Sequence, residues 1–394
     1  MIRLTRMTIV ALTLAVLPGA ACSRDNPSPP EMRAVPAEAI GVVSVGPDQA
    51  GPIVTDTDHT SVYAFDAAGT LLGQIQGGAI DLSRVLSWRR GFTTATADSV
   101  VTVTDTGRYS IPIDENIVEG AVRDTQSGRS LFWFNTGRPD GPGTAYRNNY
   151  VLTSPDGEFH TGSVPGMVFS AAHCGDRVYG VVADVESLMS DQQTIPHRLY
   201  ELPVDGGEPL LRGEWAYPAG FRTTSRASVC WADGTAIYNI YGSGEARYSE
   251  NGEPASELVR IDTATGAHTE SPVDTSGHVA VIRPNTLTLV NDRLYWIGMA
   301  DGAVLSLPLA GASEVREEWT LPAKGFGHQA TVTGTTVAHL DDTGDTPEYT
   351  EYDLLTGERT RETIALPWLK SIAHSRTESG RNRYVVTGVA CLPS

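Results

Sequence analysis

The sequence predicts an all-β fold, a seven-bladed β-propeller. A short strand pattern with alternating apolar residues recurs along the chain, and so does a hairpin pattern in which an apolar strand leads into a Gly-containing turn. The hairpin occurs seven times, about once in 50 residues, and periods of this length with four short strands each are typical of propellers. Forty Gly and 24 Pro among 394 residues suit a chain of many short strands and turns with little helix.

The clearest copy of the repeat is the segment 175–215. Its residues 178–183 alternate as a short strand, and 199–204 form the next strand after a polar loop. The turn Asp205-Gly206-Gly207 supplies positions for positive φ, so residues 208–215 can return as the partner strand. One such unit cannot bury both of its faces alone, and we therefore expect the units to pack on each other in a closed ring.

Both halves of this unit recur in order. The apolar run 177–181, which we assign to the second strand of a blade, recurs at 130–134, 236–240, 293–297 and 336–340. The hairpin recurs at 63–69, 101–107, 150–157, 199–207, 258–266, 304–311 and 352–357. The run 383–388 follows the seventh hairpin without a return strand, so we expect it to pair with the first blade near 40–45 or 53–55 and to close the ring. If this run instead belongs to a further unit, the propeller has eight blades.

Residues 1–22 form a predicted export signal. Two arginines precede the apolar run 7–17, and small residues precede Cys22. The run is too short for a stable membrane-spanning helix. The segment 17–22, Leu-Pro-Gly-Ala-Ala-Cys, resembles the lipobox of bacterial lipoproteins, which implies that Cys22 is acylated and becomes the mature N-terminus.

One position departs from the lipobox pattern. Gly19 stands where such motifs usually carry Leu, Val or Ile, so cleavage after Ala21 by an ordinary signal peptidase is the alternative. Residues 23–38 are rich in Pro, which favours extended backbone without a core. We therefore expect a tether over 23–38 and a propeller over 39–394, exported and anchored by lipid to the outer face of the cell membrane.

The chain is acidic, with 47 Asp and Glu against 29 Lys and Arg and a formal net charge of −18. Nucleic acids and anionic lipid surfaces require a basic protein face. We therefore expect no nucleic-acid partner and no membrane contact beyond the lipid anchor. The expected partner is an envelope protein or a small ligand, and we expect a monomer.

The hairpin pattern apolar-x-apolar-Asp with a following Gly, as in residues 258–266, resembles the blade repeats of quinoprotein-like bacterial seven-bladed propellers. The resemblance extends over nearly the whole mature chain and implies the fold. Propellers of this kind include enzymes, binding modules and assembly scaffolds, so the resemblance implies no particular activity.

Short catalytic motifs such as G-x-S-x-G, H-E-x-x-H, the Walker motif and the dinucleotide fingerprint are absent from the sequence. Asp341, Asp342, Asp345 and Glu348 place four carboxylates in one loop, as a calcium ion would require. Their spacing differs from that of a calcium-binding loop, so we interpret them as a solvated acidic loop. We interpret the segment 56–59 in the same way.

Large aromatic residues recur at equivalent positions of the repeat. They are Phe132, Trp133, Phe134, Tyr179, Tyr238, Tyr295 and Trp296. A carbohydrate-stacking surface is one interpretation, but rings at one repeat position usually fill the wedge between blades. We therefore expect them to pack in the core.

Candidate ligand-binding residues come from the expected entries of the innermost strands, which face the central channel of a propeller. They are Trp88, Arg222, His278, His328 and His374. Large, polar and partly cationic side chains at one mouth would attract an anionic or metal-bridged ligand in an otherwise acidic protein. The alternative is that they satisfy backbone carbonyls and waters of the channel. His173 also lies near an end of an expected inner strand.

Cys174 and Cys230 lie 56 residues apart, about one blade, and each precedes a turn into the following strand. Export makes oxidation plausible, so we expect a disulfide between neighbouring blades. The alternative is that Cys174 and Cys230 are two buried thiols. Cys391 is either left without a partner or takes the place of one of these two cysteines in the disulfide.

These features predict a lipid-anchored extracytoplasmic propeller that binds a ligand or a protein of the cell envelope without catalysis. One alternative is a metal-dependent hydrolase or lyase of the lactonase type, in which His and carboxylate side chains around the channel hold a divalent metal. Another is an assembly factor for a membrane complex. No cofactor is predicted apart from that metal alternative.

Overall fold

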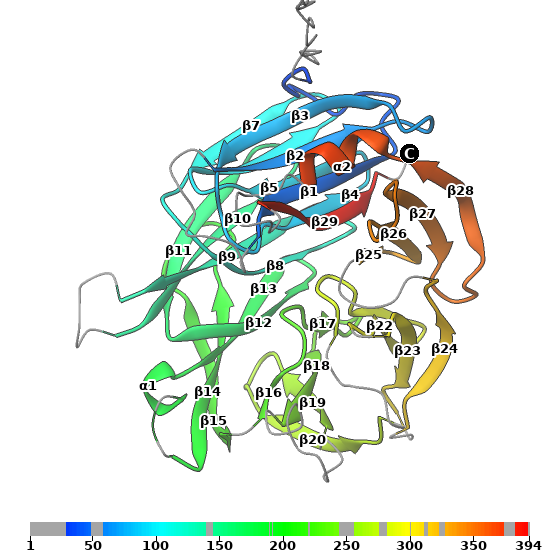
Figure 1. Cartoon of the computed structure of the whole chain (residues 1–394). Helices are drawn as coiled ribbons and strands as arrows, with labels where there is room; N and C mark the ends of the chain where they lie inside the picture. Colours follow the sequence, from blue (N-terminus) through cyan, green and yellow to red (C-terminus); the bar gives the residue numbers. More distant parts are fainter. Residues whose placement is uncertain are drawn as a thin grey trace, which may run out of the picture.

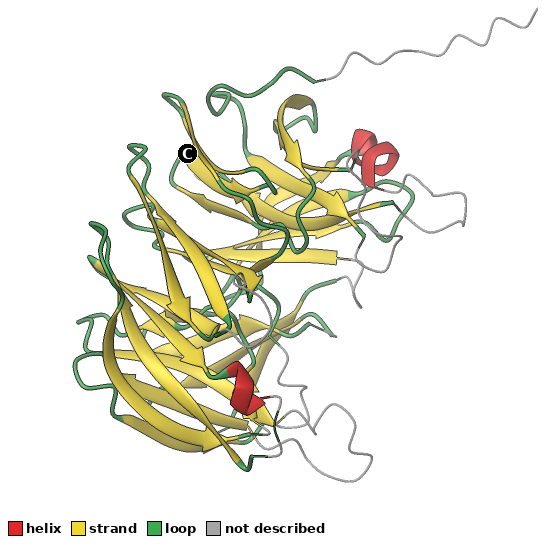
Figure 2. Cartoon of the chain, turned by 90° about the vertical axis from the view of Figure 1, so that its left-hand side faces the viewer, coloured by secondary structure: helices red, strands yellow, loops and turns green. Residues whose placement is uncertain are grey.

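The computed structural model is a seven-bladed β-propeller, as predicted. It describes residues 29–48, 58–138, 145–188, 190, 192–219, 221–243, 256–275, 282–299, 301–310, 314–322, 328–373 and 383–392. Within these residues the strands form seven antiparallel sheets, which Figure 1 shows arranged as a ring. The described helices are α1 (Val185–Leu188) and α2 (Pro367–Ala373), which lie outside the sheets (Figure 2). None of the described helices is long and apolar enough to cross a membrane.

Each sheet is one blade, and its strands are given from the channel outward. Blade 1 contains β29 (Tyr384–Cys391), β1 (Gly41–Pro47), β2 (His59–Phe65) and β3 (Leu71–Gly78). Blade 2 contains β4 (Val85–Trp88), β5 (Gly91–Ala95), β6 (Ser99–Thr104) and β7 (Arg108–Pro112). Blade 3 contains β8 (Val118–Arg123), β9 (Ser130–Gly137), β10 (Arg147–Thr153) and β11 (Phe159–Pro165).

The remaining blades follow the same order. Blade 4 contains β12 (Met167–Cys174), β13 (Arg177–Ala183), β14 (Thr194–Leu202) and β15 (Leu210–Pro218). Blade 5 contains β16 (Phe221–Thr223) and β17 (Val229–Cys230), both paired with β18 (Ala236–Ser243), then β19 (Ser256–Asp262) and β20 (His268–Val273). Blade 6 contains β21 (Thr288–Val290), β22 (Arg293–Ile297), β23 (Ala303–Pro308) and β24 (Arg316–Thr320). Blade 7 contains β25 (His328–Thr333), β26 (Thr336–Asp341), β27 (Glu348–Asp353) and β28 (Arg359–Ala365).

The C-terminal strand closes the ring in blade 1. β29 pairs antiparallel with β1, with Gly41 opposite Cys391 and Ser44 opposite Gly388. The expected pairing of the C-terminal run with the first blade near 40–45 is therefore confirmed, and β29 does not begin an eighth blade. An ion pair of 2.6 Å between Arg383 and Asp58 also links the C-terminal end to blade 1, whereas residues 56 and 57 of the second acidic segment lie outside the described part.

The hairpin pattern forms turns for a local chemical reason. In blade 1 the Asp66 carboxylate accepts hydrogen bonds from the backbone N–H groups of Ala68 (2.9 Å) and Thr70 (2.7 Å). Gly69, between them, has a φ of 77°, which glycine adopts without a steric cost. The Asp therefore satisfies the turn and the Gly permits its backbone, so an Asp followed three residues later by Gly predicts the turn.

The recurring aromatic residues pack between blades, as predicted. Phe132 and Phe134 of β9 are fully buried against residues of blade 2. Trp133, on the opposite face of the same strand, packs on blade 4 and donates a hydrogen bond of 3.2 Å from Nε1 to the Val168 carbonyl. Alternate residues of one second strand thus fill the wedges on both sides of its blade. Tyr238 is half-buried rather than buried.

The predicted boundary between tether and propeller is too late in the chain. Residues 30–38, which we call the strap, lie across blades 1 and 2. The Met32 N–H donates to the Gln74 carbonyl (2.8 Å) and the Val35 N–H donates to the Thr104 carbonyl (2.8 Å). Met32 is 3% exposed and joins the apolar core between these blades. Pro-rich backbone is extended, and extended backbone can pair with a strand edge, so composition alone misplaced the boundary.

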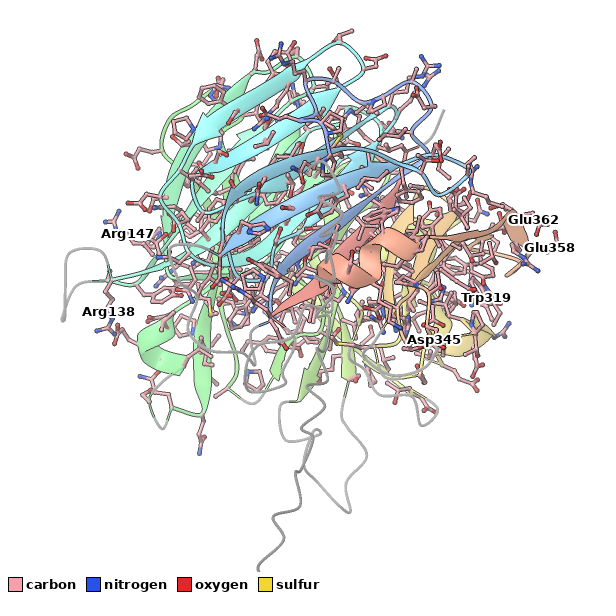
Figure 3. All side chains as sticks on the ribbon, turned by 45° about the horizontal axis from the view of Figure 1, so that its top comes forward. Arg138, Arg147, Trp319, Asp345, Glu358 and Glu362 are labelled. Carbon is pink, nitrogen blue, oxygen red and sulfur yellow. A yellow bond between two sulfur atoms is a disulfide. The ribbon has the colours of Figure 1, made fainter. Side chains whose placement is uncertain are left out.

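Several acidic side chains lie on the outside of the ring. Glu358 and Glu362 project from the outer edge of blade 7 in Figure 3. In the acidic loop, Asp341 accepts a hydrogen bond from the Thr343 N–H (2.9 Å) and Asp345 pairs with Lys370 (3.3 Å). Burial, with the nearby Asp341 carboxylate, raises the pKa of Asp342 to about 6.

Candidate ligand-binding site

Trp88 and His328 do not lie together at one mouth of the channel, although the sequence analysis placed both of them there. His328 begins β25, whereas Trp88 ends β4. Ser87, next to Trp88, lies 3.5 Å (Oγ to Oγ1) from Thr333, which ends β25. Trp88 and His328 are thus at opposite ends of the channel, and the prediction for Trp88 was wrong because it took the end of a short inner strand for its entry. The Trp88 ring packs on Gly91 and Gly128 and is 5% exposed.

His328 is a buried structural residue. Its carbonyl accepts a hydrogen bond of 2.6 Å from Arg283 Nη1, and its Nε2 lies 2.9 Å from Arg283 Nη2. Burial, together with this guanidinium, lowers the pKa of His328 to about 4, so the ring is neutral near pH 7. Arg222 lies in β16, but its side chain, like the whole of His278 and His374, is outside the described residues.

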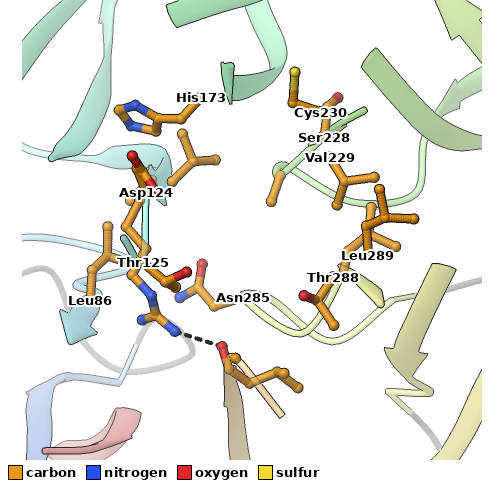
Figure 4. Close-up of a pocket in the computed structure, with 17 residues that line it drawn as sticks. Leu86, Asp124, Thr125, His173, Ser228, Val229, Cys230, Asn285, Thr288 and Leu289 are labelled. Carbon is orange, nitrogen blue, oxygen red and sulfur yellow. Dashed lines mark hydrogen bonds between the residues drawn. The ribbon is translucent and has the colours of Figure 1, made fainter. Parts of the chain in front are cut away.

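A cavity of about 200 Å³ lies toward the other end of the channel, where the inner strands finish (Figure 4). Residues of blades 2 to 7 line it. Its apolar wall includes Leu86, Val229, Leu287, Leu289 and Val332. Its polar lining includes Arg123, Asp124, Thr125, His173, Ser228 and Asn285. Small-molecule sites combine apolar walls with a few polar groups, and this lining contains both kinds of side chain.

Arg123 crosses the channel beside this cavity. It ends β8 in blade 3, and its Nη2 donates to the Val332 carbonyl and to Thr333 Oγ1, both at 2.6 Å, in blade 7. Its Nε and Nη1 are shielded from solvent and have no hydrogen-bond partner among the described residues. Burial lowers the pKa of Arg123 to about 10, and the group is still charged at pH 7. A positive charge is therefore held in this end of the channel.

His173 and Asp124 lie next to each other in the wall of the cavity, as Figure 4 shows. Both ring nitrogens of His173 are shielded from solvent without a hydrogen-bond partner among the described residues, and burial lowers its pKa to about 4 despite the nearby Asp124 carboxylate. Asp124 accepts hydrogen bonds from the Gln126 N–H (2.9 Å) and from Ser127 Oγ (2.6 Å). Asp124 thus shapes its own turn at the rim of the cavity.

The disulfide between Cys174 and Cys230 joins β12, which carries His173, to β17, which also lines the cavity. The one-blade spacing of these cysteines predicted this bond, and Cys391 is the buried free thiol of the described residues. Asn285, also in the lining, has a φ of 59°, a left-handed conformation that Asn tolerates better than most residues. Its carbonyl accepts a hydrogen bond of 3.1 Å from the Val332 N–H, which links blades 6 and 7 at the cavity.

A second charged cluster adjoins the cavity. Arg226, between β16 and β17, forms an ion pair with Glu119 of β8. Blades 3 and 5 flank blade 4, so the two side chains meet on the channel side of its inner strand β12. No sequence motif marks Glu119, Arg123 or Arg226, because each stands in an ordinary strand or loop context and reaches its partner only in the closed ring.

Comparisons with known proteins address the fold. No protein-family model matches the chain, and no curated protein matches its sequence. One similar structure is the β-propeller domain of Cps50 (Swd1) from Myceliophteria thermophila, with 14% identity, a TM-score of 0.47, and coverage of 74% of this chain and 88% of that one. A putative 6-phosphogluconolactonase from Bacteroides fragilis has 10% identity, a TM-score of 0.46, and coverage of 90% and 98%. Apo AztD from Citrobacter koseri has 12% identity, a TM-score of 0.41, and coverage of 89% of each chain.

Fold and site together define a seven-bladed β-propeller with a ligand-sized cavity and crossing charges in its channel. Propellers with such different functions share this likeness, so it assigns no activity to this chain.

Proposed function

We propose that this protein is an exported, lipid-anchored β-propeller that binds a small ligand in its central channel. The observation that carries this proposal is the cavity to which six blades contribute. Its mixed apolar and polar lining suits a ligand with both kinds of surface. Drug-sized ligands occupy pockets of roughly 300–1,000 Å³, so the volume of about 200 Å³ suits a smaller molecule.

The anchor is supported by the sequence around Cys22, with its charged N-terminus, short apolar run and small residues before the Cys. We expect Cys22→Ser to move the protein from the membrane fraction to the soluble fraction. Unchanged membrane fractionation, with no acyl mass on the N-terminal peptide of the wild type, contradicts the anchor.

Thr125 allows a direct test of the cavity, because it is exposed and lines the cavity, so a larger side chain can fill the space without disturbing the core. A library of small soluble molecules is screened by ligand-observed NMR. We expect hits that bind the wild type and Thr125→Val but not Thr125→Trp. The proposal fails if no molecule binds, or if every hit binds Thr125→Trp as tightly as it binds the wild type.

Among the described residues, no group of three or more His, Cys, Asp or Glu side chains is placed to hold a metal ion. No observation on the described part of the chain favours the metal-dependent hydrolase or the assembly factor over the binding protein. An envelope-protein partner stays a prediction, to be tested by affinity capture from solubilised membranes.

A further inference from the structure

Arg123 holds a positive charge at the cavity that no acidic side chain offsets. Its Nη2 donates to the Val332 carbonyl and to the Thr333 hydroxyl, both at 2.6 Å, and both acceptors are uncharged. In the described part of the chain it forms no ion pair with an Asp or a Glu. Charges inside proteins are normally paired, so Arg123 is able to take its counterion from outside the protein.

Two nitrogens of the same guanidinium are unused. Nε and Nη1 are shielded from solvent and have no hydrogen-bond partner among the described residues. Donors left in this way cost free energy until an acceptor reaches them. The Arg123 side chain as a whole is half-buried and lines the cavity, so a turn about its outer bonds brings a donor to a ligand there. Such side-chain changes are common on binding.

The polar wall sets the charge of the ligand. Asp124 is a carboxylate of the lining, and it already accepts hydrogen bonds from the Gln126 N–H (2.9 Å) and from Ser127 Oγ (2.6 Å). His173 beside it is neutral near pH 7, because burial lowers its pKa to about 4. One guanidinium can therefore hold one negative charge, whereas a second negative charge on the ligand would be repelled by Asp124.

The other side of the cavity is apolar. In Figure 4, Val229 and Leu289 lie across the cavity from Asp124 and His173. Leu287 belongs to the same lining and is buried. This wall suits a hydrocarbon tail, and the volume of about 200 Å³ limits that tail to a short chain.

We propose that the cavity binds a small monocarboxylate, with its carboxylate on Arg123 and its tail against Val229, Leu287 and Leu289. This inference rests on the cavity proposed above as the binding site, and it names the class of the ligand. A guanidinium binds a carboxylate more strongly than it binds a neutral acceptor. An inorganic anion gains only the charge contact, and an uncharged chain gains only the apolar contact.

The test uses hexanoate, butyrate and acetate as probes. Hexanamide is the uncharged analogue of hexanoate, and adipate is the dianion of the same chain length. Binding to the purified protein is measured by titration calorimetry at constant ionic strength. We expect hexanoate to bind more tightly than the shorter acids, by up to roughly fourfold for each methylene. We expect hexanamide and adipate to bind roughly tenfold more weakly than hexanoate.

Arg123→Met removes the charge at the cavity. Arg316→Met is the matched control, because Arg316 is an exposed residue of the outer strand β24 and its removal changes the net charge equally. We expect Arg123→Met to bind hexanoate roughly tenfold more weakly than Arg316→Met, with the affinity for hexanamide unchanged. A purely structural role of Arg123 would weaken both ligands alike. If Arg123→Met does not fold, the preference of the wild type for hexanoate over hexanamide decides.

The outcomes separate this inference from the proposed function. If hexanamide binds the wild type as tightly as hexanoate, or if Arg123→Met keeps the preference for hexanoate, the role of Arg123 is wrong. If no carboxylate binds but other small molecules bind and are excluded by Thr125→Trp, the ligand class is wrong and the proposed function stands. Hexanoate that binds Thr125→Trp as tightly as the wild type binds elsewhere and overturns the inference. If no small molecule binds at all, both proposals are wrong.

Discussion

We expect four histidines to make the stability of the molecule depend on acid. His197, His328 and His339 are buried and His173 is half-buried at the cavity. Burial is the main cause that lowers the pKa of each to about 4. His197 is fully buried among rings, with Tyr217 stacked at 5.4 Å and Phe169 edge-on at 5.4 Å. Such rings pack as neutral groups, because burial disfavours their charged form.

We predict that stability falls as the pH falls from about 6.5 to 4. An unfolded His binds a proton near pH 6.5, whereas these folded rings bind one only near pH 4. The unfolded state therefore binds more protons in this window, and each His contributes up to about 1.4 kcal/mol of lost stability per pH unit. Asp342, whose pKa is raised to about 6, opposes this by at most one proton. Urea unfolding at several pH values measures the slope.

His197→Phe is the variant that isolates one of these groups, because the Phe ring suits the surrounding aromatic residues. We expect the free energy of unfolding of this variant to fall less steeply with decreasing pH than that of the wild type. The two slopes should differ by the contribution of one proton. A slope equal to that of the wild type would show that His197 does not control the response.

At the scale of elements, the disulfide holds the two inner strands that carry one wall of the cavity. β12 ends at Cys174, next to His173, and β17 ends at Cys230. β17 has only two residues and pairs with one strand, so it has few backbone hydrogen bonds of its own. The covalent bond to β12 therefore fixes a weakly held strand at the cavity.

We predict that Cys174→Ser with Cys230→Ser lowers the free energy of unfolding by about 4 kcal/mol, since the bond closes a long loop in the unfolded chain. Urea unfolding of the variant and of the oxidised wild type measures the difference. Cys391→Ala is the control, because it removes the buried thiol without touching the bond. The wild type is also unfolded under reducing conditions, after the disulfide has been shown to be broken. The prediction is contradicted if the unfolding midpoint does not change.

The second and third strands of the blades could be predicted because their signals are local. Asp262 and Gly266 specify a turn by their own chemistry, and apolar runs such as 293–297 alternate clearly. The inner strands could not be placed as well. β4 has four residues and β17 has two, and their register depends on contacts with other blades rather than on their own sequence. Trp88 was misplaced for this reason.

At the scale of the whole molecule, the site depends on a closed ring. Arg123 joins blade 3 to blade 7, and the Arg226 to Glu119 pair joins blade 5 to blade 3. These contacts join residues about 100 to 200 positions apart in the chain, and no sequence pattern relates their positions. The sequence could therefore predict a channel with a cationic lining, but not which side chains meet in it.

Ring closure by β29 leads to the last prediction. β29 pairs with β1 along its length and contributes Val386 and Val389 to the core between blades 1 and 7. Without it, blade 1 loses its inner strand and the seven sheets lose the contact that makes them one cooperative unit. We expect a chain that ends at residue 383 to lack a cooperative unfolding transition in circular dichroism and to be cut rapidly by protease.

Deletion of the strap, residues 30–38, is the comparison, because it removes Met32 and Val35 from the core but leaves every blade complete. That variant should fold with a lower unfolding midpoint. Cooperative unfolding of the chain without β29 at the midpoint of the wild type would mean that the ring does not need this strand.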